Sequence, residues 1–322
     1  MDRNLAMNVA RVTEAAALAS GKFMGKGDKN GADGAAVDAM RRMFDTVDIN
    51  GTVVIGEGEI DEAPMLYIGE KIGTKNESEE KVDIAVDPLD GTSSIADGMA
   101  NAVSVLAVAP KGCLLNAPDV YMDKIAVGPK AKGKISLEYP VAKNIEIVAE
   151  SLSKKVEEVT VAVLDRERHA DLIKEIRKTG ARIKKVSDGD VIAAIETCFE
   201  SAGVDMLIGI GGAPEGVIAA AALKCLGGDF QGQLMPLDHP QRQRCEKLNS
   251  DLEKIYHIDD LVKGNEVIFS ATGISEGELL GGVKYLKGHQ AITESLLIRL
   301  PSGTIRFLKT IHKLDQKPGY AW

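Results

Sequence analysis

The stretch VTVAVLDRERHADLIKEIRKTGARIKKV, residues 159–186, decides how the C-terminal half is expected to fold. Val159–Leu164 is an apolar run of strand length, a helix is expected around Ala170–Lys178, and Arg182–Val186 reads as a second strand. The same order continues downstream with a helix around Val191–Phe199, a strand at Met206–Ile210 and a helix around Val217–Leu226. Strands that alternate with helices predict parallel pairing and an α/β fold.

The remaining elements are predicted from spacing. Apolar residues 4, 3, 4 and 3 apart, from Leu5 to Ala19, predict a helix with Asp2 as its cap, and a second helix is expected to begin near Asp33. Buried strands are expected at 52–55, 82–86 and 103–108, and a hairpin at Leu296–Leu300, Ser302-Gly303-Thr304 and Ile305–Ile311. We expect two subdomains, residues 1–145 and 146–322.

Composition limits the class of protein. The chain has 322 residues, of which 44% are hydrophobic, so it can bury a sizeable core. Its net charge of −9 argues against a nucleic-acid partner or an anionic membrane surface. The longest apolar run, Val217–Leu223, is too short to span a bilayer.

The cysteines predict a reducing compartment. They form no CxxC pair, and no histidine lies at zinc-ligand spacing from one: Cys113, Cys198, Cys225 and Cys245. The N-terminus has no apolar region typical of a signal peptide. We therefore expect a cytoplasmic protein with reduced thiols.

The segment AVDPLDGTSS, residues 85–94, places two carboxylates where a buried strand stops. Asp87 and Asp90 lie three residues apart around Pro88, and Gly91 follows. A surface turn would use the same residue types, so that reading stays open.

More carboxylates follow the strand at 52–55. In GEGEIDE, residues 56–62, the acids Glu57, Glu59 and Asp61 alternate, so a continuing strand would point all three to one face. Two carboxylates about 4 Å apart repel by roughly 4 kcal/mol at an effective dielectric of about 20. Oxygen ligands without Cys or His suit a hard cation such as Mg²⁺ or Mn²⁺. The alternative is a solvated strand end.

A glycine-rich loop with Lys29 opens the second expected helix, where Asp33 lies. A carboxylate at the start of a helix is stabilised by the helix dipole, so Asp33 needs no ligand to explain it. A glycine-rich loop with a lysine at the start of a helix is also suited to binding a phosphate.

The three C-terminal strands end in polar loops. Ligands of α/β sheets bind outside the carboxyl ends of strands. Each loop alone could be a cap or a turn, but together they indicate a phosphate-bearing ligand. The loops carry Asp165, Arg166, Glu167 and Arg168; Ser187, Asp188, Gly189 and Asp190; and Gly212 with Glu215.

Several motifs carry a family resemblance. VDPLDGT at 86–92 resembles the signature of the metal-dependent, lithium-sensitive sugar and inositol phosphatases. Five further segments narrow this to class II fructose-1,6-bisphosphatase: GDKNGADGAAV at 27–37, GTVVIGEGEIDEAPMLYIGE at 51–70, APDVYM at 117–122, DGD at 188–190 and GIGGAPEGV at 209–217. The resemblance implies a layered α-β-α-β-α sandwich of two subdomains, and a homo-oligomer, dimer or tetramer.

The resemblance also implies roles for residues. By this resemblance, Asp33 and Glu57 look like ligands of one Mn²⁺ or Mg²⁺ ion. A second ion would be held by Asp87, Asp90 and Glu215, together with the Leu89 carbonyl. Whether Glu59 and Asp61 bind a third ion is left open. Thr92, Lys29 and Asp61 are the expected catalytic residues, Thr92 acting on the attacking water. The expected substrate contacts are Asp90, Gly91, Thr92, Tyr121, Arg166, Glu167, Arg168, Asp188, Gly189, Asp190 and Gly212.

The implied reaction is hydrolysis of the 1-phosphate of fructose 1,6-bisphosphate in gluconeogenesis. Sedoheptulose 1,7-bisphosphate, an inositol phosphate, or a non-catalytic phosphosugar sensor are the alternatives. Two departures bear on this: Asp90 stands where several class II members have Glu, and residues 165–168 read Asp-Arg-Glu-Arg where others have a Lys-Pro-Arg pattern.

Overall fold

The computed structural model describes residues 1, 4–58, 65–74 and 80–322. They form two compact units, Met1–Leu114 with Gly264–Trp322, and Leu115–Lys263. These bounds differ from the division after residue 145 suggested by the sequence. The C-terminal segment returns to the first unit because its strands complete the first sheet, and the strand at Tyr121–Val127 already belongs to the second.

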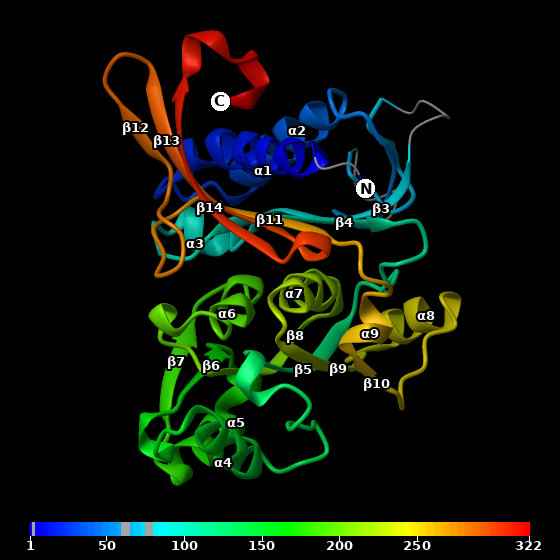
Figure 1. Cartoon of the computed structure of the whole chain (residues 1–322), viewed down its shortest axis with the longest axis vertical. Coiled ribbons are helices and arrows are strands. Elements are labelled where there is room, and N and C mark those ends of the chain that lie inside the picture. The colour runs from blue at the N-terminus through cyan, green and yellow to red at the C-terminus, as the bar shows by residue number, and fades with distance from the viewer. Residues whose placement is uncertain (2–3, 59–64, 75–79) are drawn as a thin grey trace. The chain divides into compact units, whose positions relative to one another are not determined.

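In the described chain the first unit contains an eight-stranded sheet, ordered β12-β13-β11-β4-β3-β1-β2 with β14 paired to β13 (Figure 1). Its strands are β1 (Asn50–Ile55), β2 (Lys71–Ile72), β3 (Lys81–Asp90), β4 (Val103–Pro110), β11 (Ile268–Gly273), β12 (Lys284–Leu286), β13 (Gln290–Arg299) and β14 (Thr304–Lys313). β13 and β14 form the antiparallel hairpin predicted near the C-terminus.

Helices α1 (Leu5–Ser20) and α2 (Lys29–Phe44) pack on this sheet, and their buried faces share a core with Val86 and Leu106. The two predicted helices are confirmed, but α2 begins earlier than Asp33. It begins at Lys29 because the Asp28 side chain caps the helix by accepting a hydrogen bond from the Gly31 N–H. Asn4 takes the cap position of α1, and Asp2 lies outside the described residues.

β3 continues past the point where the sequence suggests that it ends. Asp87 is opposite Val105 in β4 and Asp90 is opposite Val103, so β3 carries one extra residue between them. Such a bulge re-aims the side chains around it. Pro88 is accommodated there, and α3 (Thr92–Ala96) follows one residue after the strand.

In the described chain the second unit has a six-stranded sheet, ordered β10-β9-β5-β8-β6-β7. Its strands are β5 (Tyr121–Val127), β6 (Thr160–Leu164), β7 (Arg182–Val186), β8 (Met206–Gly212), β9 (Asp229–Leu234) and β10 (Ile255–His257). Its helices are α4 (Val141–Leu152), α5 (Ala170–Thr179), α6 (Val191–Glu196), α7 (Ala213–Leu226), α8 (His239–Lys247) and α9 (Ile258–Leu261). α4 and α5 cover one face of the sheet and α6 and α7 the other (Figure 1).

The predicted parallel pairing is confirmed, because β6 runs parallel to both β7 and β8. The fold class is therefore α/β, with helices layered on the sheet of each unit. α7 begins at Ala213 rather than near Val217, so Glu215 lies in its first turn instead of just before the helix.

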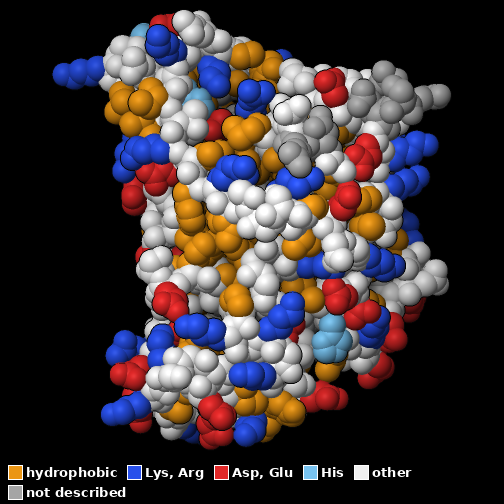
Figure 2. Space-filling view, in the orientation of Figure 1, with side chains coloured by type: hydrophobic (Ala, Val, Ile, Leu, Met, Phe, Trp, Pro, Cys, Tyr) orange, Lys and Arg blue, Asp and Glu red, His pale blue; other side chains and the backbone are white. Residues whose placement is uncertain are grey.

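Three further findings concern membrane spans, surface charge and thiols. None of the helices in the described residues is both long and apolar enough to traverse a bilayer. On the face in Figure 2, Lys and Arg side chains are interspersed with Asp and Glu. All four cysteines are free thiols.

Candidate active site

The turn after β3 is built around Gly91, whose φ of 98° favours glycine. A Cβ at this position would lie 3.2 Å from the Ala102 Cα. Before the turn, Asp87 Oδ1 accepts a hydrogen bond from the Leu89 N–H at 3.0 Å, and Asp90 is buried. The bulge and the turn thus fix the backbone from Asp87 to Thr92, the first residue of α3. This stretch includes both predicted carboxylate ligands.

Lys29 lies beside this turn. Its Nζ donates a hydrogen bond to Ser93 Oγ at 2.8 Å, joining the first turn of α2 to that of α3. The glycine-rich loop before α2 is fixed to α3 as well, since the N–H groups of Gly25 and Gly27 donate to the carbonyls of α3 at 2.9 Å. Asp33 comes four residues after Lys29 and so shares its face of α2. Burial raises the pKa of Asp33.

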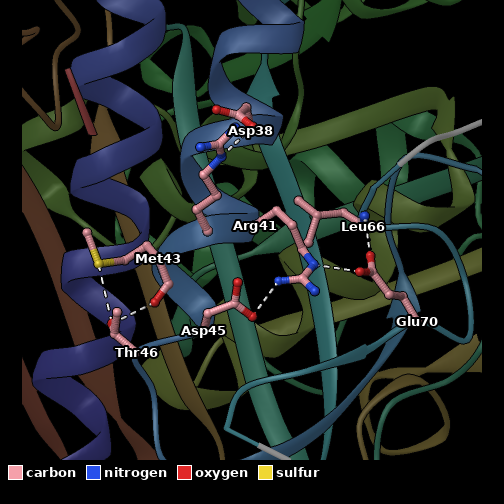
Figure 3. A network of polar contacts seen from close by, with 8 residues as sticks. Asp38, Arg41, Met43, Asp45, Thr46, Leu66 and Glu70 are labelled. Carbon is pink, nitrogen blue, oxygen red and sulfur yellow. Dashed lines mark hydrogen bonds and ion pairs between the residues drawn. The ribbon is translucent and has the colours of Figure 1, made fainter. Parts of the chain in front are cut away.

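Glu57 belongs to the same edge of the sheet. β1 and β3 are parallel, so the residues after β1 lie beside the carboxyl end of β3. The Glu57 N–H donates to the Leu66 carbonyl at 3.0 Å. Glu70 accepts hydrogen bonds from both Arg41 of α2 and the Leu66 N–H (Figure 3). This network connects the backbone at Glu57 with the helix that carries Asp33.

The first unit therefore gathers Lys29, Asp33, Glu57, the Asp87–Asp90 bulge and Thr92 around one end of its parallel strands. Glu59 and Asp61 lie outside the described residues. Within the residues that are described, no three Asp, Glu, His or Cys side chains stand together as a ready-made metal site.

The second unit gathers another group of predicted residues. Tyr121 of β5 is directly opposite Gly212 of β8. The Arg168 guanidinium lies 4.7 Å from the Tyr121 ring centroid, in cation–π geometry, and its Nη2 donates to the Ile210 carbonyl at 2.9 Å.

The loops after β6 and β7 meet at the same edge. Arg166 forms an ion pair with Asp188 at 2.7 Å and also donates to the Ser187 carbonyl. Gly189 has a φ of 71°, which the turn after Asp188 requires. Glu167 is exposed at the start of a short 3₁₀ helix, Glu167–His169.

Asp190 is buried, whereas Asp188 and Gly189 before it are partly exposed. It is 5% exposed and forms an ion pair with Lys124 of β5, at 2.7 Å between Nζ and Oδ2. Glu215 is close to this pair. Burial raises the pKa of Glu215, and the Lys124 charge opposes that shift. Among the described residues, the buried Glu215 Oε2 has no hydrogen-bond partner. An uncompensated buried carboxylate oxygen fits a cation ligand.

Two buried residues of the second unit, Lys124 and His169, were not identified from the sequence. Lys124 is 1% exposed, and its signal in the sequence is a lysine beside Asp123 in the otherwise apolar strand MDKIAV. His169 is also 1% exposed and contacts β6 and β8 through both ring nitrogens. Nothing in the sequence around His169 distinguishes it from a solvated histidine.

The predicted residues are thus divided between the units. Lys29, Asp33, Glu57, Asp87, Asp90 and Thr92 belong to the first, and Tyr121, Arg166, Arg168, Asp188 and Glu215 to the second. The first group offers carboxylates and a lysine, and the second offers arginines and a tyrosine in addition to carboxylates.

Comparison with known proteins gives matches along nearly the whole chain. The family model described as bacterial fructose-1,6-bisphosphatase, glpX-encoded, matches residues 3–312. Fructose-1,6-bisphosphatase 1 class 2 of Escherichia coli (strain K12) is 51% identical over 98% of this chain and 97% of its own length. The Shigella flexneri class 2 enzyme shows the same identity and coverage.

A further relative, from Synechococcus sp. (strain JA-3-3Ab), is named D-fructose 1,6-bisphosphatase class 2/sedoheptulose 1,7-bisphosphatase. It is 46% identical over 99% of this chain and 98% of its own length. The family match and these identities lead to one conclusion: the chain belongs to the bacterial, class II fructose-1,6-bisphosphatase family.

Proposed function

We propose that this protein is a phosphatase that hydrolyses the 1-phosphate of fructose 1,6-bisphosphate, giving fructose 6-phosphate and phosphate in gluconeogenesis. The observation that carries the proposal is family membership over nearly the whole chain. Within the second unit, Arg166 and Arg168 follow a strand end and are suited to a phosphate, which agrees with a phosphorylated substrate.

The reaction is proposed to need Mn²⁺ or Mg²⁺. Fructose-1,6-bisphosphatases are metal-dependent in general. Asp33 and Glu57 would hold one ion. Asp87, Asp90 and Glu215 would hold a second, together with the Leu89 carbonyl. The donor set fits, since these are oxygen ligands and the buried Glu215 Oε2 has no partner among the described residues. When bound, such ions stabilise the charge that develops on the transferring phosphoryl group.

The chain's own groups around the Gly91 turn have separate tasks. The Thr92 hydroxyl orients the attacking water, and the backbone from Asp90 to Thr92 contacts the scissile phosphate. Lys29, fixed beside this turn through Ser93, adds a positive charge there. Asp61 is proposed as a further catalytic carboxylate, from the sequence alone.

The second unit is proposed to hold the sugar and the phosphate that does not react. Arg166 and Arg168 would bind this phosphate, and Tyr121 would pack beside it. Guanidinium groups recognise phosphate well because their N–H donors form a planar fork. The other proposed contacts are Glu167, Asp188, Gly189, Asp190 and Gly212.

Sedoheptulose 1,7-bisphosphate is a second candidate substrate, because the Synechococcus relative is named for both activities. Phosphate release from a panel of fructose 1,6-bisphosphate, sedoheptulose 1,7-bisphosphate and inositol 1-phosphate distinguishes these functions. The proposal expects the highest kcat/KM on fructose 1,6-bisphosphate. No release from any of the three would favour a phosphosugar sensor and overturn the proposal.

We also propose a cytoplasmic homo-oligomer, dimer or tetramer. The exposed apolar side chains on one face of β14 support association, with Ile305 45%, Phe307 55% and Ile311 66% exposed. Light scattering after size exclusion measures the oligomeric state, and a monomer at micromolar concentration would contradict this proposal.

A further inference from the structure

His169 lies where β6 and β8 stop pairing. The two strands are registered at Val161 with Met206 and at Ala162 with Leu207, although β6 continues to Leu164 and β8 to Gly212. Beyond these pairs the imidazole bridges the strands instead. The Ile210 N–H donates to Nε2 at 2.8 Å, and Nδ1 lies 2.8 Å from the Leu164 carbonyl.

The room for this ring depends on Gly209. Its φ is 136°, and a Cβ there would lie 3.0 Å from His169 Nε2. Any side chain at residue 209 would be strained and would push the imidazole away. The strand is therefore shaped locally to receive His169.

The hydrogen bonds assign the tautomer of His169. Because Nε2 accepts from a backbone N–H, the proton must be on Nδ1, which donates to the Leu164 carbonyl. The neutral ring satisfies both partners. Burial lowers the pKa of His169, which agrees with a ring that stays neutral.

His169 and Arg168 bind the two backbone groups of Ile210, its N–H and its carbonyl. Ile210 donates its N–H to His169, and its carbonyl accepts from Arg168 Nε at 3.2 Å and Nη2 at 2.9 Å. Arg168 in turn lies over Tyr121, at 4.7 Å from the ring centroid. A shift of Ile210 would thus move the carbonyl that orients the Arg168 guanidinium.

We propose that His169 is a positioning residue for the non-reacting phosphate of the substrate: by wedging between β6 and β8 it fixes Ile210, and through it the orientation of Arg168 over Tyr121. This inference rests on the proposed function, which gives Arg168 that phosphate. His169 itself does not touch the substrate.

The test compares two substrates that differ only in that phosphate, fructose 1,6-bisphosphate and fructose 1-phosphate. His169→Leu should raise KM for the bisphosphate about tenfold, as expected for a misplaced charged hydrogen bond, with kcat within threefold. Its KM for fructose 1-phosphate should not change. His169→Gln retains an amide oxygen to accept from the Ile210 N–H and should keep most of the wild-type preference for the bisphosphate.

The matched control is His312→Leu, since His312 is a histidine of the first unit with only 2% exposure. It should leave the ratio of kcat/KM for the two substrates unchanged, whatever it does to the melting temperature. The double variant His169→Leu/Arg168→Ala should be no worse than Arg168→Ala, because both changes remove the same contact.

Equal losses on both substrates in His169→Leu, or an unchanged ratio, would overturn the inference. If His169→Leu does not fold, His169→Phe replaces it, since its ring fills the space but cannot accept the Ile210 N–H, and an unchanged ratio in that variant would overturn the inference instead. A wild-type protein without activity on the bisphosphate refutes the proposed function and this inference with it. An active wild type whose ratio does not respond to His169 refutes only this inference.

Discussion

Lys29 of α2 donates a hydrogen bond to Ser93 of α3 across 2.8 Å, although 64 positions separate them in the chain. This contact places an ammonium group one residue from Thr92, at the turn proposed to meet the scissile phosphate. Its importance lies in the charge that it fixes there, since an exposed hydrogen bond of this kind contributes little to folding.

Removing the ammonium group should therefore slow the reaction. We expect Lys29→Ala to lower kcat by about 10²-fold, because preorganised charge at the reacting phosphate acts mostly in the transition state. Ser93→Ala keeps the ammonium group and should lose less than about tenfold in kcat. Steady-state kinetics on fructose 1,6-bisphosphate measure both, and wild-type kcat in Lys29→Ala would contradict the placement.

The arginines of the second unit should behave in the opposite way. Their contacts hold the phosphate that does not react, so they act equally in ground and transition states. Arg166→Ala and Arg168→Ala should raise KM about tenfold to 150-fold, since a hydrogen bond to a charged group contributes roughly 1.5–3 kcal/mol. Thr92→Ala should instead lower kcat with little change in KM. If both arginine variants keep the wild-type KM, the phosphate that does not react must be bound by other residues.

The buried pair of Lys124 and Asp190 leads to a prediction about stability. Lys124→Met leaves a buried carboxylate without its partner, which typically costs about 3–5 kcal/mol. The melting temperature should fall by roughly 10 °C. The matched control is Lys130→Met, which breaks the exposed pair with Glu200 in the same unit. Calorimetry should show a much smaller shift for the control, and equal shifts would contradict a structural role for Lys124.

His312 should make the fold sensitive to acid. Burial lowers its pKa from 6.5 to about 4, and its Nε2 lies 2.8 Å from Thr293 Oγ1. The unfolded chain binds this proton more readily, so stability falls as pH decreases from 6.5 toward 4. The full loss is roughly 3 kcal/mol, since the pKa falls from 6.5 to about 4 and each pKa unit corresponds to 1.36 kcal/mol.

His312→Gln keeps a polar partner for Thr293 but does not titrate. Its free energy of unfolding should therefore fall less between pH 7.5 and pH 4.5 than that of the wild type. His169 also has a lowered pKa, but it is present in both proteins, so the difference reports His312. Denaturant unfolding at the two pH values measures it, and identical pH dependence would contradict the buried neutral state of His312.

The structure shows which features local sequence can predict. The strands and helices of 159–226 follow from spacing because each element carries its own apolar pattern. The same holds for the C-terminal hairpin. The bulge in β3 was not predicted, since Pro88 between two acids resembles a strand end unless the register with β4 is known.

Long-range contacts explain the rest. The return of β11, β13 and β14 to the first sheet depends on pairing between strands more than 150 residues apart, as for Ile268 and Val108. Lys124 and His169 become informative only through partners on other elements, Asp190 at the start of α6 and Ile210 in β8. The acidic motifs were visible because each lies within a short stretch of sequence, whereas the burial of Glu215 beside Lys124 depends on contacts between distant residues.

The carboxylates of Asp33, Glu57, Asp87, Asp90 and Glu215 are proposed to hold the divalent cations that the reaction requires. The direct measurement is phosphate release from fructose 1,6-bisphosphate after exhaustive dialysis against EDTA, followed by addition of Mn²⁺ or Mg²⁺. Activity should be lost on chelation and restored by either ion, and Glu57→Ala and Asp87→Ala should stay several orders of magnitude below wild-type kcat while remaining folded. Full turnover in excess EDTA, or near-normal kcat in both variants, would contradict the account.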